Sequence, residues 1–447
     1  MLFSSFEFLF IFFPIFLTVY LLCKPSFRYV VLLAFSLAFY GLSDLRFLLL
    51  PIVSALVHYA LAALAERHKY GVALAVGFDV LLLAFFKYYD GVAAILGFES
   101  IGLLLPLGIS FYSFSALSYV IDVSRGMPRE KNFFRFLSYV VMFPKILSGP
   151  IARYEETGKQ LVLPNMTYAN ASLGICRLIA GLCKKLVLAA PAQELWEYFC
   201  ALSSEQRGAL GSWLALVFFA FWLYYDFSGY TDMAIGIAKI LGFSLPENFD
   251  YPYISVSPRD FWRRWHITLS AWFRDYVYIP LGGNRCSRAR EMLNLLAVWV
   301  LTGLWHGSTL NFLIWGLYWF VLLGMSKLLP KSWSAWIPHT VKRALMIPVI
   351  LVSWLIFAFG DMGEGLSFFL SLFSKTPWTE LVLYELSRNT ALLAILVLGA
   401  TPLPKKWFHR HIFGHAAART AVALGAFLLA LSYLAGGTHQ PFLYLNF

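Results

Sequence analysis

Long apolar runs separated by short polar loops fill the first third of the chain. They lie at about 3–22, 29–42, 47–65, 70–86 and 101–121. Most approach the roughly 20 residues that an α-helix needs to cross a hydrocarbon core about 30 Å thick. The first run carries one charge, Glu7, and follows no basic segment, so it predicts a retained first span and not a removable signal peptide. The pattern therefore predicts a series of transmembrane helices.

The pattern becomes less regular after residue 135. Residues 136–153 form an apolar run interrupted by Pro144, Lys145 and Pro150. This interruption predicts a re-entrant or half-spanning segment, with an ordinary short span and a loop as the alternative. Further apolar runs flank a polar stretch at 244–291, and they lie at about 171–193, 211–240, 292–325, 343–360, 364–374, 388–403 and 416–436. We expect ten to twelve spans in all.

The composition agrees with a membrane protein. Of 447 residues, 60% are hydrophobic and 13% are charged, whereas a soluble globular chain has roughly 25% charged residues. So few charges cannot cover a soluble surface of this size, which leaves a lipid-facing exterior. No polar block is long enough for a separate soluble domain, so we predict one all-α membrane domain over residues 1–447.

The net charge of +11 does not indicate nucleic-acid binding, because the basic residues lie in short loops. The loops at 23–28, 66–69 and 122–135 carry eight Lys and Arg, whereas the opposing loops carry only Arg46 and Lys87. The positive-inside rule places the richer loops in the cytoplasm, so the N-terminus is predicted outside. The basic run at 405–411 is predicted cytoplasmic too, which places the C-terminus outside.

His306 is the first candidate for chemistry. It lies near the middle of 35 residues, 292–326, that contain no Asp, Glu, Lys or Arg. One straight helix of that length would measure about 52 Å, so the segment must tilt, break near Gly307-Ser308 or leave the membrane. A histidine at that depth faces protein or a wet cavity, and it can accept a proton from a hydroxyl. A structural histidine bonded to another span is the alternative. The adjacent Trp305 and Asn311 are candidate substrate-binding residues.

The second candidate is the stretch 258–285, in which tryptophans alternate with basic residues. It is too polar to span a membrane and too aromatic for a soluble loop, so it predicts an interfacial or re-entrant segment. Arg263 and Arg264 are candidates for binding the phosphates of a nucleotide thioester, because Arg pairs phosphate bidentately. Anchoring to lipid headgroups is the alternative. His266 is the residue that anchoring explains least.

The third candidate is Asp226, which lies with Asp232 inside the apolar run at 211–240. A carboxylate at membrane depth indicates function by default. The structural alternative, which we favour, is that Asp226 pairs with a basic residue of the 258–285 stretch. The sequence has no Walker A, GxSxG or HExxH motif and no Cys/His spacing for a metal, so we expect no metal and no tightly bound cofactor.

The segments around these residues resemble membrane-bound O-acyltransferases, in particular the branch that acetylates alginate and related exopolysaccharides. The resemblance is carried by YYDFSGYTDMAIGIAKILGF (224–243), the stretch 248–285 and LTGLWHGSTLNFLIWG (301–316). The opening segment 1–22, the segments 106–126 and 143–154 and the terminal PFLYLNF resemble the same branch. The resemblance implies a ring of tilted helices with re-entrant segments around a funnel. It implies that His306 is the catalytic histidine and that His266 is the second histidine of this branch. Relatives often have a further histidine where this chain has Trp319, so no role for a third histidine is implied.

The resemblance also implies a reaction. The expected donor is cytoplasmic acetyl-CoA, and the acetyl group is expected to cross the inner membrane to a periplasmic SGNH-type partner that modifies the polysaccharide. His306 acts either as a general base or as a covalent acetyl carrier, and the residues do not separate these two roles. Two alternatives stay open: D-alanyl transfer from a carrier protein, and a lipid-linked sugar flippase, although we find none of the related halves that transporters often show. Membrane lipids are expected contacts, and nucleic acid is not.

Overall fold

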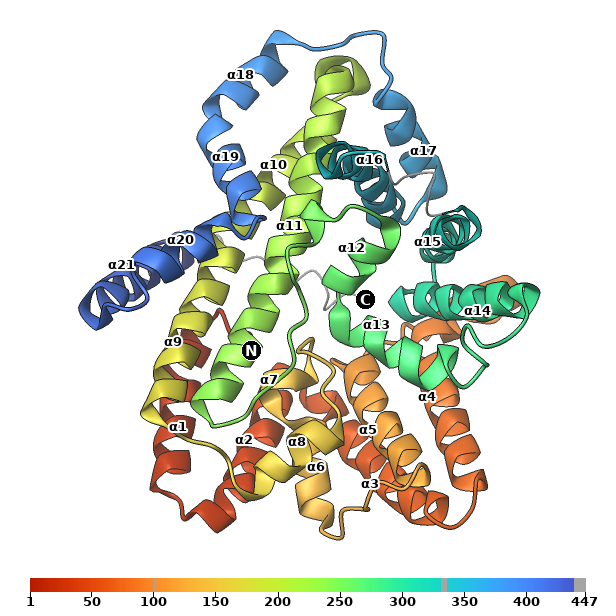
Figure 1. Cartoon of the computed structure of the whole chain (residues 1–447), viewed down its shortest axis with the longest axis vertical. Coiled ribbons are helices and arrows are strands. Elements are labelled where there is room, and N and C mark those ends of the chain that lie inside the picture. Colours follow the sequence, from red (N-terminus) through yellow and green to blue (C-terminus); the bar gives the residue numbers. More distant parts are fainter. Residues whose placement is uncertain (100, 331–335, 438–447) are drawn as a thin grey trace. The chain divides into compact units, whose positions relative to one another are not determined.

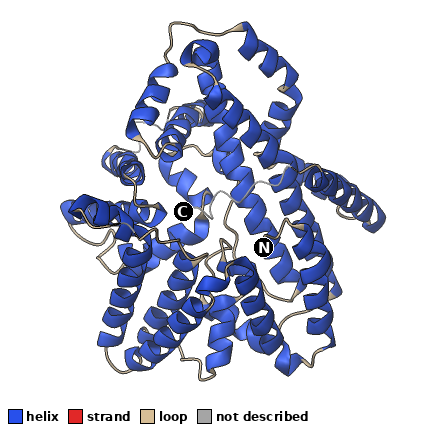
Figure 2. Ribbon diagram, turned by 180° about the vertical axis from the view of Figure 1, so that it is seen from behind, coloured by secondary structure: helices blue, strands red, loops and turns tan. Residues whose placement is uncertain are grey.

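The computed structural model describes residues 1–99, 101–330 and 336–437. Within these residues every regular element is a helix and none is a strand (Figure 2). The described chain divides into two compact units. Among the described residues, the N-terminal unit comprises Met1–Leu182 and Tyr230–Glu247, and the C-terminal unit comprises Cys183–Gly229 and residues 248–437. The prediction of one domain over 1–447 stays a prediction, and the terminal PFLYLNF lies outside the described residues.

The N-terminal unit consists of the helices coloured red to yellow in Figure 1, together with the last turns of α11. Its helices are η1 (Glu7–Phe12), α1 (Phe13–Leu22), η2 (Pro25–Phe27), α2 (Arg28–Ser43), η3 (Leu45–Phe47), α3 (Leu49–Ala65), α4 (Tyr70–Leu96), α5 (Ile109–Ser124), α6 (Phe133–Val141), α7 (Phe143–Ile146), α8 (Tyr154–Val162) and α9 (Tyr168–Cys183).

The C-terminal unit begins at the end of α9 and contains most of α11, which is kinked at Gly208. Its helices are η4 (Lys184–Ala189), α10 (Ala190–Ala201), α11 (Ser204–Ile240), η5 (Pro252–Ile254), α12 (Pro258–Arg264), α13 (Ile267–Phe273), η6 (Arg274–Tyr278), α14 (Arg288–His306), α15 (Leu310–Leu328), α16 (His339–Ala358), α17 (Met362–Ser371), α18 (Glu380–Arg388), α19 (Thr390–Gly399), α20 (Leu403–His411) and α21 (Ala416–Ala435).

The predicted polytopic membrane architecture is confirmed. Seven helices of the described chain are long and apolar enough to cross a membrane, and the number is eight if α18 and α19, bent by 60°, form one span. Several of these helices expose large apolar side chains, as α21 does with Leu424, Leu428 and Leu429. Exposed apolar surface on this scale requires a lipid environment. The larger prediction of ten to twelve spans includes shorter apolar helices, and it stays a prediction.

One irregular segment is broken as expected, and one predicted span begins later than expected. The run at 136–153 is broken as expected: the extended backbone of Met142 (ψ 112°) ends α6 and precedes the four-residue α7. The span predicted at 101–121 is wrong at its N-terminal end, because α5 begins only at Ile109. Gly108 precedes it with a φ of 68°, and a Cβ there would lie 2.1 Å from the carbonyl oxygen of Ile146. Only glycine satisfies both conditions at this turn.

The predicted topology can be tested by labelling. Single cysteines at Arg129 and Lys406, in a background without the five native cysteines, are expected to be protected from an impermeant thiol reagent in intact cells and modified after permeabilisation. The physical reason is the excess of basic residues in both segments, which favours the cytoplasmic side. Modification of either cysteine in intact cells would contradict the orientation.

Candidate active site

The hairpin of α14 and α15 positions His306. Of the three outcomes that the length of the apolar segment allows, the structure shows the break: α14 ends at His306 and α15 begins at Leu310. The two helices pack closely because glycines lie at their crossing. A Cβ at Gly303 would lie 2.5 Å from the Phe312 carbonyl oxygen, and one at Gly316 would lie 2.4 Å from that of Trp299. Gly303 and Gly316 therefore allow the close packing of α14 against α15 that positions the last turn of α14, which carries His306.

His306 lies in an aromatic pocket and is 2% exposed. Its ring makes edge contacts with the rings of Trp305, Trp315 and Phe357, at centroid distances of 4.8, 4.9 and 5.3 Å. It also lies nearly parallel to the ring of Phe312. These contacts fix the orientation of the imidazole and keep bulk water from it.

His266 lies at the junction of α12 and α13, where it is 1% exposed. Its backbone is left-handed (φ 44°, ψ 53°), an uncommon conformation for a residue other than glycine. Its Nδ1 lies 3.2 Å from Oδ1 of Asn248, an oxygen that also accepts hydrogen bonds from the backbone N–H and the hydroxyl of Thr268. Because an amide oxygen only accepts, Nδ1 of His266 carries the proton and donates it. Burial lowers the pKa of His266, so the ring is neutral with Nε2 as its basic nitrogen.

Trp305 lies against both histidines. Its ring centroid is 4.8 Å from that of His306 and 6.0 Å from that of His266. The ring of Phe227, on α11, closes the other side of His266 at 4.9 Å. The structure thus brings the two predicted histidines to one tryptophan in one aromatic-lined region. Strained backbone at a buried histidine is typical of functional sites, and the basic nitrogen of a neutral imidazole can accept a proton during a reaction.

Two neighbouring residues have structural contacts. The amide nitrogen of Asn311 donates to the carbonyl oxygens of Ile356 and Phe357, both at 3.3 Å, so it fastens the start of α15 to the end of α16. Its role in substrate binding stays a prediction. Trp319 is fully buried and its indole N–H donates to Ser353 at 2.9 Å. The position where relatives have a histidine is therefore a packing position here.

The two predicted phosphate-binding arginines have different surroundings. Arg264 pairs with Asp260 at 3.0 Å and with Asp250 at 3.3 Å, which ties α12 to the preceding loop. Arg263 is exposed. Both line a cleft of about 400 Å³, called the basic cleft below. Its walls are Ile254, Val256, Ser257, Arg259, Asp260, Arg263, Arg264, His339 and Arg343. The cleft carries four guanidinium groups and a single carboxylate, so it suits an anion.

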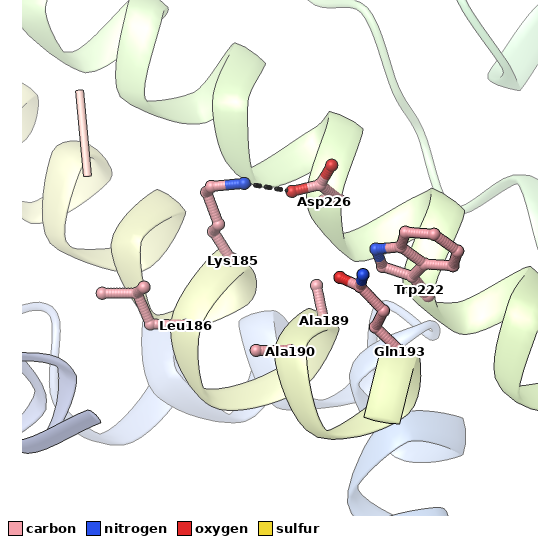
Figure 3. Close-up of a pocket in the computed structure, with 7 residues that line it drawn as sticks. All are labelled: Lys185, Leu186, Ala189, Ala190, Gln193, Trp222 and Asp226. Atoms are coloured by element: carbon pink, nitrogen blue, oxygen red, sulfur yellow. Dashed lines mark hydrogen bonds and ion pairs between the residues drawn. The ribbon is translucent and has the colours of Figure 1, made fainter. Parts of the chain in front are cut away.

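Asp226 is part of a buried ion pair. Figure 3 shows Lys185 reaching from η4 toward Asp226 on α11, beside a cavity of about 10 Å³ that Gln193 and Trp222 also line. The two side chains are 6% and 4% exposed. The expected pairing is confirmed, but its predicted partner is wrong, because the cation comes from η4 and not from the 258–285 stretch. A direct role of Asp226 in substrate binding stays a prediction.

Sequence reasoning missed three of these residues and one pair. Lys185, Asn248 and Arg343 were not singled out. The fourth omission is a pair in the N-terminal unit: His58 on α3 contacts Asp79 on α4, Nε2 to Oδ2, at 3.1 Å, and both are buried within candidate spans. The signal was present, because a charged residue inside an apolar run requires a partner. Among the described residues, no group of three His, Cys, Asp or Glu side chains is placed to bind a metal ion.

The fold and the site together define a polytopic membrane enzyme with a buried histidine site. A sequence model of the membrane-bound O-acyltransferase family matches residues 129–372. This range includes both histidines and the basic cleft, and it begins after α5. The chain belongs to that family and is an acyltransferase.

Three relatives illustrate its range. A protein named probable alginate O-acetylase AlgI, from Pseudomonas putida, is 37% identical over 87% of this chain and 83% of its own. A peptidoglycan O-acetyltransferase from Helicobacter pylori is 33% identical over 80% of this chain and 74% of its own. A teichoic acid D-alanyltransferase from Bacillus subtilis is 31% identical over 57% of this chain and 67% of its own.

Proposed function

We propose that this acyltransferase moves acetyl groups from cytoplasmic acetyl-CoA across the inner membrane for O-acetylation of an extracellular polysaccharide such as alginate. A periplasmic SGNH-type protein is the proposed partner that delivers the acetyl group to the sugar. The observation that supports the proposal most is the placement of His266 and His306 against Trp305. The similarity to O-acetyl-transferring relatives over 80–87% of the chain favours acetyl over D-alanyl, whose relative matches 57%.

Two routes use the same histidine. In the first, His306 accepts the proton of an acceptor hydroxyl, the hydroxyl oxygen attacks the acetyl carbon, and the carbon–sulfur bond breaks. The departing thiolate of coenzyme A then takes up the proton. In the second, the imidazole nitrogen attacks the acetyl carbon, the carbon–sulfur bond breaks, and coenzyme A leaves as a thiol with the proton that the acylated ring loses. The acceptor hydroxyl oxygen then attacks the acetyl carbon, the nitrogen–carbon bond breaks, and the hydroxyl proton returns to the imidazole. Asn248 holds His266 with its Nε2 unprotonated, so His266 is proposed to accept a hydrogen bond or a proton during either route.

Donor binding is proposed for the basic cleft, and Arg263 tests it best because it is exposed and not part of the ion pairs of Arg264. Arg263→Ala is expected to raise KM for acetyl-CoA about 10- to 100-fold, since a hydrogen bond to a charged group contributes roughly 1.5–3 kcal/mol. Steady-state kinetics in nanodiscs measures this, with Arg388→Ala on α18 as the matched control. If KM is unchanged in both Arg263→Ala and Arg264→Ala, the arginines anchor the protein and do not bind donor.

The donor that the protein consumes distinguishes acetyl transfer, D-alanyl transfer and a flippase, the three functions that the sequence leaves open. Purified protein is offered radiolabelled acetyl-CoA or a D-alanyl carrier protein, each with and without a candidate SGNH partner. Acetyl transfer requires release of coenzyme A and label on the partner or on polysaccharide. Use of the carrier protein alone would establish D-alanyl transfer instead. Consumption of neither donor would favour a flippase and would contradict the proposal.

A further inference from the structure

The basic cleft adjoins an apolar groove in the C-terminal unit. The groove has a volume of about 340 Å³, and its lining includes Tyr253, Ile254, Ile347, Ile350, Val397 and Thr401. Ile254 lines both the groove and the basic cleft. The two cavities therefore meet at η5, one charged and the other apolar. Together they match a ligand with an anionic head and a hydrocarbon chain.

The basic cleft has an excess of positive charge, which favours an anionic ligand. Asp260 is its one carboxylate, and it already accepts from Arg264 at 3.0 Å and from the backbone N–H of Val256 at 3.1 Å. Arg259, Arg263 and Arg343 are exposed to solvent in the cleft. Nε of Arg343 donates to the carbonyl oxygen of Ile254 at 3.2 Å, which places this guanidinium where the two cavities meet.

The cleft lies where a lipid headgroup would be. His339 and Arg343 occupy the first turns of α16, and His339–Ala358 is a candidate membrane span. The ends of spans lie in the headgroup region, and basic pockets between transmembrane helices bind anionic headgroups. The groove residues Ile347 and Ile350 follow on the same helix, one to two turns deeper.

The groove accepts hydrocarbon but not a polar chain. Two hydroxyls line it, and both already donate within the protein: Tyr253 to the carbonyl oxygen of Ala220 at 2.5 Å, and Thr401 to that of Leu398 at 2.7 Å. The amides of a pantetheine arm would lose their hydrogen bonds to water there without replacement, which is costly. An acyl chain has no such groups to satisfy, so the groove selects a lipid over the arm of coenzyme A.

We propose that the cleft and the groove form one binding site for an anionic phospholipid, with its phosphate beside Arg259, Arg263 and Arg343 and one acyl chain in the groove. Because the proposed function assigns the donor's phosphates to Arg263, the lipid and acetyl-CoA compete for the cleft. Anionic lipid then raises KM for acetyl-CoA without changing kcat. This consequence rests on the proposed function, whereas lipid binding itself does not.

Native mass spectrometry of the whole protein tests the site, with phosphatidylglycerol and phosphatidylcholine of the same chain length offered as probes. Each arginine near the phosphate is expected to contribute about fivefold to phosphatidylglycerol binding, so Arg259→Gln and Arg343→Gln each lower it about fivefold. Arg343→Lys retains most of the preference. Val397→Trp, at a half-exposed groove position, lowers binding of both lipids. The controls are Arg410→Gln and Leu424→Trp, exposed positions that line neither cavity, and they bind as wild type.

The outcomes separate this proposal from the donor assignment. An Arg259→Gln/Arg343→Gln variant that elutes and melts like wild type, yet keeps the full preference for phosphatidylglycerol, overturns the lipid site. Equal loss in Val397→Trp and Leu424→Trp overturns it too, because that result describes bulk lipid contact. If acetyl-CoA binding falls in the arginine variants while lipid binding is unchanged, the cleft binds only the donor. If lipid binding falls in these variants while acetyl-CoA binding is unchanged both in them and in Arg263→Ala, the lipid site stands and the donor assignment of Arg263 fails.

Discussion

Replacing His306 with alanine is expected to lower the rate of acetyl transfer by about 10²–10⁴-fold, the range that a positioned general base contributes. The loss should fall on kcat, because the imidazole lies in the aromatic pocket, where the proposed function places the reaction, and does not line the basic cleft. If His306 carries the acetyl group covalently, the loss is larger and any trapped acetyl-enzyme disappears. Acetyl transfer by detergent-purified protein measures the effect.

Alanine at this position also leaves a cavity between Trp315 and Phe357, so the thermal unfolding of the variant must be compared with that of wild type. Membrane insertion should be unaffected, because removing the imidazole leaves no charge unpaired. A variant that inserts normally and transfers acetyl groups at more than about a tenth of the wild-type rate would contradict a catalytic role.

Replacing Lys185 with methionine is expected to lower the free energy of unfolding by roughly 3–5 kcal/mol. Lys185 and Asp226 are both almost fully buried, so removing the cation takes the opposite charge away from a buried carboxylate (Figure 3). Chemical unfolding in detergent, followed by tryptophan fluorescence, measures the change.

The neighbouring Lys184 is the matched control, because it is partly exposed and lies outside the cavity that Lys185 lines. Lys184→Met should change the free energy of unfolding by less than about 1 kcal/mol. The double replacement Lys185→Met/Asp226→Leu should recover most of the lost stability, since an apolar pair of similar volume can replace a buried ion pair. A single Lys185→Met variant as stable as wild type would show that the pair contributes nothing.

The helical membrane architecture was predictable because its signal is local. A span requires about 20 consecutive apolar residues, so hydropathy along the chain locates α3, α11 and α16 without knowledge of their neighbours. The length of the segment around His306 limited it to a strong tilt, a break or an exit from the membrane, since a straight helix of 35 residues without Asp, Glu, Lys or Arg exceeds the thickness of the bilayer; the structure shows the break. The late start of α5 could not be predicted from the sequence, because the constraint on Gly108 comes from the backbone of Ile146, 38 residues later.

The candidate site was predictable residue by residue but not in its contacts. A histidine or aspartate in an apolar run reveals that a partner exists, yet pairing is decided by tertiary packing. The partner of Asp226 was therefore misassigned, and Asn248, which orients His266, was not noticed among other polar residues. Only one side of the basic cleft was predicted, for the same reason. Arg263 and Arg264 lie on one segment, whereas His339 and Arg343 come from α16, more than 70 residues later.

Replacing His306 with glutamine tests the central claim most directly. Glutamine keeps hydrogen-bonding capacity and much of the side-chain volume, but it cannot accept a proton near neutral pH or carry an acetyl group as imidazole does. The measurement is transfer of radiolabelled acetyl from acetyl-CoA by variant and wild-type proteins that insert and melt alike. We expect the His306→Gln protein to lose at least about 100-fold in transfer. A folded, membrane-inserted His306→Gln protein with near wild-type transfer would contradict both catalytic roles and leave His306 as a structural histidine.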